Sequence, residues 1–207
     1  MTGLPSGSTS PVALPQSIGW AIGLPLLAVV CGLGSALWMA RHAPANGIHV
    51  GAWHASLLAG SERADRYTRA RIAVGGLLAL NRAETLYYLA TTDTTGTPLH
   101  ARCHYRVSGV PLPARWWSIT AYADDLYLFP NAMHRYSVNQ ATARVSQGRF
   151  SLETGPLPPK DTAMLWLPTP GDSGLVLTLR LYQPESGLQQ APADLAAPLI
   201  ERIGACT

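Results

Sequence analysis

The chain has 207 residues, of which 47% are hydrophobic and 13% are charged, and its formal net charge at pH 7 is +3. The 15 Lys and Arg residues are scattered along the sequence. Nucleic-acid binding requires clusters of basic residues that contact phosphates, so this composition argues against a nucleic-acid partner.

The N-terminal part carries no charged side chain before Arg41, and an apolar run extends from Ile18 to Met39. A helix of about 20 apolar residues crosses the hydrocarbon layer of a bilayer. We therefore expect a disordered tail over residues 1–16 and a transmembrane helix over residues 17–40, with the lipid bilayer as its partner. A cleavable signal peptide is the alternative, but the run lacks a basic start and exceeds the usual apolar core of about 7–15 residues.

Small residues recur every four positions along this run, which places them on one face of the helix. They are Gly19 and Gly23 in the first half, and Ala28, Gly32 and Ala36 in the second. Because two backbones can approach closely along such a face, the pattern favours a helix–helix partner. The alternative is that glycine and alanine are simply common in membrane helices.

Three further segments are expected after the apolar run: a linker at 41–64, a folded domain at 65–190 and a C-terminal tail at 191–207. At the start of the domain, the apolar spacing from Asp65 to Leu80 predicts a helix. Asn81 and Glu84 have the spacing of a capping box, which predicts a second, short helix beginning there.

The remainder of the domain is typical of short strands separated by turns, with the turn Asp93-Thr94-Thr95-Gly96 between the first two. The expected strands cover residues 87–92, 99–107, 116–122, 126–129, 149–153, 163–167 and 175–182. Several short strands without intervening helices indicate a mainly β fold. We expect an antiparallel, jelly-roll-like β-sandwich with one or two short helices, preceded by a single N-terminal transmembrane helix.

His100, Cys103 and His104 are residue types that bind metals. On a strand, however, the two histidines share one face and Cys103 points to the other, so the three cannot surround one ion. We therefore expect no metal and no cofactor. The sequence contains no nucleophile elbow, His-Glu-x-x-His motif, Walker loop or dinucleotide fingerprint, which favours a protein that is not an enzyme.

Cysteine is rare in the chain: Cys31 lies in the apolar run, Cys103 in the middle of the domain and Cys206 in the C-terminal tail. A disulfide between Cys103 and Cys206 would fix this tail to the domain if the domain faces an oxidising compartment. The alternative is two unrelated thiols.

Five ordered motifs between Tyr67 and Pro184 resemble the bacterial family known as domain of unknown function 1214, which is related to the 1254 family. The matching residues are Asp93 and Gly96; Trp117, Ser118, Thr120 and Tyr122; Asn131, Arg135, Tyr136 and Ser137; Trp166 to Pro168; and Arg180, Leu181, Tyr182 and Pro184. The chain departs from the family pattern at Leu165, where an Asn usually precedes the Trp, and at residues 146–148, where an Asp-Gly turn is common.

The resemblance implies a jelly-roll-like β-sandwich in the bacterial cell envelope, and the chain is similar to short members with one N-terminal anchor. It favours a single-pass protein of the inner membrane with its domain in the periplasm. Arg41 and His42, immediately after the helix, favour the cytoplasm instead by the positive-inside rule. The family brings no established activity.

The resemblance also singles out five ligand-binding residues: Arg135, Tyr136, Trp166, Arg180 and Tyr182. Guanidinium groups and aromatic rings favour carboxylate or sugar ligands. The alternative is that the two arginines organise hydrogen bonds within the scaffold and that the rings belong to the core.

Three functions are compatible with these residues. The first is a membrane-anchored envelope protein that binds a ligand or partner without catalysis. The second is an envelope hydrolase whose pocket holds the same arginines and tyrosines, with His134 or His104 as its base. The third is a structural component of the envelope.

Overall fold

The computed structural model describes residues 16–42, 47–56, 58, 60–61, 64–74 and 80–206. The chain divides into two compact units, Met1–Ala43 and Pro44–Thr207. The predicted disordered tail lies outside the described residues, apart from Gln16, which begins the first helix.

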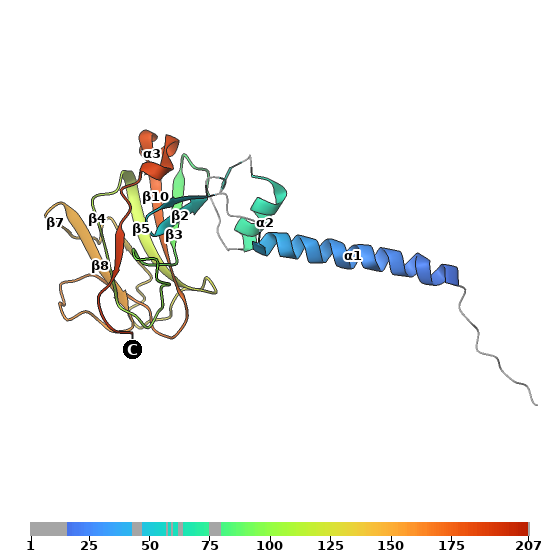
Figure 1. Cartoon of the computed structure of the whole chain (residues 1–207). Helices are drawn as coiled ribbons and strands as arrows, with labels where there is room; N and C mark the ends of the chain where they lie inside the picture. Colours follow the sequence, from blue (N-terminus) through green and yellow to red (C-terminus); the bar gives the residue numbers. More distant parts are fainter. Residues whose placement is uncertain are drawn as a thin grey trace, which may run out of the picture. The chain divides into compact units, whose positions relative to one another are not determined.

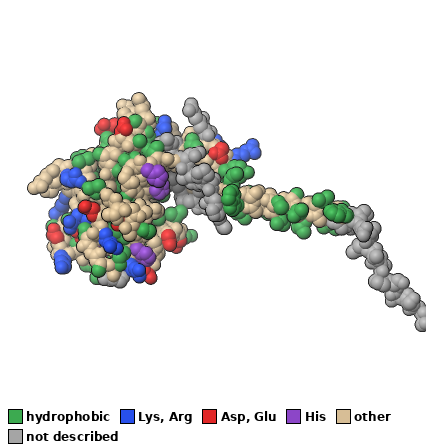
Figure 2. All heavy atoms as spheres, viewed as in Figure 1, with side chains coloured by type: hydrophobic (Ala, Val, Ile, Leu, Met, Phe, Trp, Pro, Cys, Tyr) green, Lys and Arg blue, Asp and Glu red, His purple; other side chains and the backbone are tan. Residues whose placement is uncertain are grey.

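The described part of the first unit is the helix α1, Gln16–His42. Within it, Trp20–Met39 has a mean hydropathy of 2.0 and contains no buried residue, and it is long and apolar enough to cross a membrane. Figure 2 shows hydrophobic side chains along the visible face of this helix. A signal sequence near the N-terminus would share this length and composition.

The second unit is a mainly β body with two sheets, seen in Figure 1. One sheet has six strands in the order β1-β2-β3-β10-β5-β6, and the other has five, β11-β4-β8-β7 with β9 paired to β8. The strands are β1 Gly47–Val50, β2 Trp53–Ser56, β3 Thr85–Ala90, β4 Tyr105–Gly109, β5 Ala114–Ala123, β6 Ser137–Asn139, β7 Val145–Ser146, β8 Arg149–Gly155, β9 Trp166–Pro168, β10 Leu175–Pro184 and β11 Leu199–Arg202.

All strand pairs are antiparallel except β8 with β9. Among its described residues, the body also has three short helical segments: α2 Arg66–Val74, α3 Ser186–Gln190 and the 3₁₀ turn η1 Pro192–Asp194. The prediction of a mainly β fold with two antiparallel sheets, few short helices and an apolar N-terminal helix is confirmed. The jelly-roll connectivity stays a prediction.

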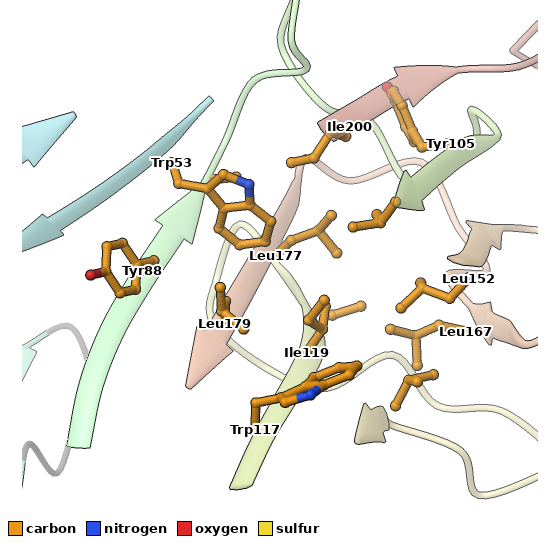
Figure 3. Packing of buried hydrophobic residues seen from close by; sticks show 14 of the residues in the cluster. Trp53, Tyr88, Tyr105, Trp117, Ile119, Leu152, Leu167, Leu177, Leu179 and Ile200 are labelled. Atoms are coloured by element: carbon orange, nitrogen blue, oxygen red, sulfur yellow. The ribbon is translucent and has the colours of Figure 1, made fainter. Parts of the chain in front are cut away.

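The core lies between the two sheets because strand residues alternate between opposite faces. On β10, Leu177 and Leu179 are fully buried, and Ile119 of β5 is paired with Leu179. Figure 3 shows these side chains directed toward Leu152 of β8 and Leu167 of β9 in the other sheet. This alternation leaves the opposite face of the six-stranded sheet for other side chains.

Several sequence predictions are wrong in detail. The expected helix at Asn81 is a turn followed by β3, because the backbone N–H groups of Glu84 and Thr85 both donate to the carbonyl of Asn81. The expected strand at 99–107 is regular only from Tyr105, since residues 101–102 form a turn. The opposite-face argument against a metal at His100–His104 therefore loses its basis.

The ends of the domain also differ from the expected boundaries. The segment 41–64 contains β1 and β2, which extend the six-stranded sheet at its edge. The C-terminal tail contains η1 and β11, and β11 pairs with β4. The strands β1, β2 and β11 are short, and pairing with neighbouring strands holds them in place rather than a strong alternation of apolar and polar residues.

The C-terminal residues are tied to the body by buried side-chain contacts. The indole Nε1 of Trp53 donates a 2.7 Å hydrogen bond to the carbonyl of Pro198, and the hydroxyl of Tyr88 donates one of 2.8 Å to the carbonyl of Pro192. Cys103 and Cys206 are joined by a disulfide. The segment after β10 is thus part of the core rather than a tail.

The turn after β3 is organised by Asp93. Its Oδ1 accepts hydrogen bonds from the backbone N–H groups of Thr95 and Thr97 and from the Thr95 hydroxyl, and Gly96 supplies a positive φ of 86°. Burial alone would raise the pKa of Asp93, but these hydrogen bonds and the charge of Arg202 outweigh burial and hold it below its ordinary value of 3.8.

We expect Asp93 to contribute an acid-dependent part of the stability. Because the pKa is lower in the folded state, the contribution is complete above the ordinary value and is lost as the pH falls through the folded one. Asp93→Asn, which keeps an Oδ1 acceptor, should flatten this part of the curve when melting temperature is followed from about pH 5 to about pH 2. An equally steep loss in the variant would contradict the assignment.

Candidate functional site

The face of the six-stranded sheet that points away from the core is polar and aromatic. Cross-strand pairs set Arg180 of β10 beside Tyr87 of β3 and Ser118 of β5, and Tyr182 beside Thr85 and Trp116. We call this the outer face. It also carries Thr120 and Tyr122 of β5 and Thr178 and Val176 of β10.

Arg180 is the central charged residue of the outer face. Its guanidinium donates hydrogen bonds to the Thr120 hydroxyl at 3.1 Å and to the Tyr122 hydroxyl at 2.9 Å. Its Cζ lies 5.6 Å from the centroid of the Tyr122 ring. Among the described residues, no carboxylate lies within ion-pair distance of Arg180. Within the described part of the chain, the partners of this half-buried positive charge are therefore two neutral hydroxyls and a ring.

A pocket of about 400 Å³ opens at the Tyr182 end of the outer face. Its lining residues are Leu80, Glu84, Thr85, Arg115, Trp116, Tyr182 and Gln183. The hydroxyl of Thr85 is buried and has no hydrogen-bond partner among the described residues. Arg115 donates a 3.0 Å hydrogen bond to Oε1 of Gln183. The pocket thus combines two aromatic rings with charged, amide and hydroxyl groups.

Arg135 and Trp166 belong to a second, separate arrangement. The guanidinium of Arg135 donates to the backbone carbonyl of Trp166 at 3.1 Å, and the Trp166 indole donates to the carbonyl of Gly155. The side-chain amide of Asn131 makes two hydrogen bonds to the backbone of Arg135: its Nδ2 donates to the carbonyl, and its Oδ1 accepts from the N–H. These contacts fix the loop before β6 to β9 of the other sheet, which is a scaffold role.

The five residues singled out from the sequence therefore play different parts. Tyr182 lines the pocket, and Arg180 lies two residues away on the same strand face. Arg135, Tyr136 and Trp166 are not among the lining residues. Tyr136 contacts His134, whose Nδ1 lies 3.4 Å from the Tyr136 hydroxyl oxygen.

The histidines of the segment 100–104, where no metal is expected from the sequence, have local partners. His100 lies 3.7 Å from the Asp172 carboxylate, and Arg102 lies 3.4 Å from the same oxygen. The ring of His104 packs against Gly155, where a Cβ would come within 2.5 Å of Nδ1. In the part of the chain that the structure describes, no three His, Cys, Asp or Glu side chains gather around one point.

Sequence reasoning missed the pocket residues Thr85, Arg115 and Trp116. Trp116 precedes the Trp-Ser motif by one position, so strand alternation would have placed it on the face of Ser118. The pairing of Trp116 with Tyr182 depends on strand order, which the sequence does not give.

Comparison with known families decides the relationship of the body. Residues 84–186 match the family described as "Protein of unknown function (DUF1214)". The chain belongs to the DUF1214 family. The matched region contains Arg180, Tyr182 and most of the pocket, whereas the strands β1, β2 and β11 and the residue Cys206 lie outside it.

One solved structure shows the same fold at low identity. The VPA0106 protein from Vibrio parahaemolyticus is 16% identical, with a TM-score of 0.55 over 94% of this chain. An uncharacterized protein from Burkholderia cenocepacia is 17% identical, with a TM-score of 0.38 over 58% of this chain and 29% of its own. The DUF1214 chain spans about half of the Vibrio protein, 47% of which is covered. No curated protein matches the chain.

Proposed function

We propose that the chain is a non-catalytic binding protein of the bacterial envelope, tethered to the inner membrane by α1, with an anionic ligand on the outer face of its six-stranded sheet. The observation that carries this proposal is Arg180. A half-buried guanidinium with hydroxyl neighbours and no carboxylate partner among the described residues is suited to a ligand carboxylate or phosphate.

The neighbouring pocket indicates the rest of the ligand. Trp116 and Tyr182 offer ring surface, and the unpaired Thr85 hydroxyl offers a hydrogen bond. Pockets that bind small molecules combine apolar walls with a few polar groups in this way. We expect an anionic group attached to a ring or sugar.

The support for a periplasmic location is the disulfide, not the charges that follow the helix. Disulfides persist in oxidising compartments, and Cys103 is joined to Cys206. A binding role is favoured over the hydrolase because neither His104 nor His134 lines the pocket. We also propose that the small residues of α1 contact a second helix; they are Gly19, Gly23, Ala28, Gly32 and Ala36.

Arg180→Gln tests the proposal with benzoate, which carries a carboxylate on a ring. Calorimetric titration of the full chain in detergent should show benzoate binding that weakens about tenfold to a hundredfold in the variant. The reason is that a hydrogen bond to a charged group contributes about 1.5–3 kcal/mol. Benzyl alcohol, which has the ring without the charge, should bind both proteins equally weakly.

Arg149→Gln is the matched control, because Arg149 is an exposed arginine on β8 of the other sheet. It should bind benzoate as the unmodified chain does. Equal binding by Arg180→Gln would refute the assigned role of Arg180. Absence of binding by the unmodified chain, together with envelope damage on deletion, would favour the structural role.

A further inference from the structure

A pair of histidines faces outward on the first hairpin of the body. Strands β1 and β2 set His49 directly opposite His54, and the turn between them contains Gly51 at a φ of 61°. Trp53 and Ala55, on either side of His54, are buried in the core. The two imidazoles therefore lie together on the outer face, at its edge.

The spacing of the two rings suits a shared metal ion. Their centroids are 6.1 Å apart and their planes are inclined by 39°. A ring nitrogen binds zinc at about 2.0–2.1 Å, which puts the ion about 3.2 Å from the ring centroid. Two rings on one ion thus have centroids at most about 6.4 Å apart. The observed separation lies just inside this limit, which is the linear arrangement, so a smaller angle at the ion requires the exposed ring of His49 to rotate toward His54.

The surroundings of the two imidazoles also suit metal binding. Among the described residues, no hydrogen bond or ion pair engages either ring. Burial, and secondarily the positive charge of His49 when protonated, lowers the pKa of His54. A neutral imidazole nitrogen is the form that binds a metal.

We propose that His49 and His54 chelate a divalent late first-row transition metal, with Cu²⁺ as the best probe, since imidazole suits these ions and copper binds most tightly among them. No third His, Cys, Asp or Glu joins the pair among the described residues. With respect to the described residues the site is therefore open, and water or an oxygen ligand can take its remaining positions. This proposal does not depend on the anion site proposed at Arg180.

Electron paramagnetic resonance of the full chain in detergent, purified without a histidine tag and titrated with Cu²⁺ alone, tests the site. We expect one bound Cu²⁺ per chain with hyperfine splitting from two imidazole nitrogens. His49→Gln and His54→Gln should each lose the two-nitrogen pattern, and the double variant should lose the bound ion.

His134→Gln is the control, because His134 is an exposed histidine of a loop in the same body. It should keep the two-nitrogen spectrum. The two-nitrogen spectrum in the double variant, or its absence in the unmodified chain, would overturn the proposal. Melting temperatures without metal should be equal in all variants, which separates loss of the ligands from loss of the fold.

Discussion

Replacing Cys206 with serine should lower the free energy of unfolding of the body by about 2–4 kcal/mol. The disulfide joins residues 103 positions apart in the sequence, so it removes a large loop from the unfolded chain. The loss should appear as a shift of the urea midpoint measured on the full chain in detergent under non-reducing conditions. A reducing agent should lower the midpoint of the unmodified chain by a similar amount.

Cys31→Ser is the control for this prediction. Cys31 is a free, exposed thiol of α1, far in sequence from the bonded pair. Its replacement should leave the urea midpoint of the body unchanged. A Cys206→Ser variant as stable as the unmodified chain would mean that the C-terminal segment is held by its other contacts alone.

Leu179→Ala should destabilise the body by about 2–5 kcal/mol, the usual range for truncating a buried leucine. Leu179 is fully buried on β10 and is paired with Tyr88 on one side and Ile119 on the other. Figure 3 shows its side chain in the middle of the core. Truncation leaves a cavity between two sheets that cannot collapse around it.

Leu157→Ala provides the comparison, since Leu157 is 57% exposed. The free energy of unfolding derived from its urea midpoint should differ from that of the unmodified chain by less than about 0.5 kcal/mol. Similar midpoints for the two variants would show that β10 does not occupy the centre of the core. Both measurements use the full chain in the same detergent.

The long strands of the body were predictable because their residues alternate strongly. Trp117, Ile119 and Ala121 point inward while Ser118 and Thr120 point outward, and β5 was found almost to its ends. The hairpin β1–β2 was not found, since each strand has only four residues and the hairpin joins the sheet through the pairing of β2 with β3. Local pattern is weak where tertiary pairing decides the structure.

The candidate site was only partly predictable for a related reason. Arg180 and Tyr182 stood out through their motif, but motif membership grouped them with Arg135 and Trp166, which fix a loop to the other sheet. The pocket depends on the register that sets Tyr182 beside Trp116. His49 and His54 lie opposite each other through the pairing of β1 with β2, and because that hairpin was not predicted, the histidine pair was missed as well.

The anchoring of residues 192–206 has a consequence for biogenesis. The carbonyls of Pro192 and Pro198 complete the hydrogen bonding of two rings from the first strands, and Ile200 fills the space beside Val107. A nascent chain therefore exposes an unfinished interior until those residues have emerged from the ribosome and, if exported, have been translocated. The disulfide between Cys103 and Cys206 can form only after that point.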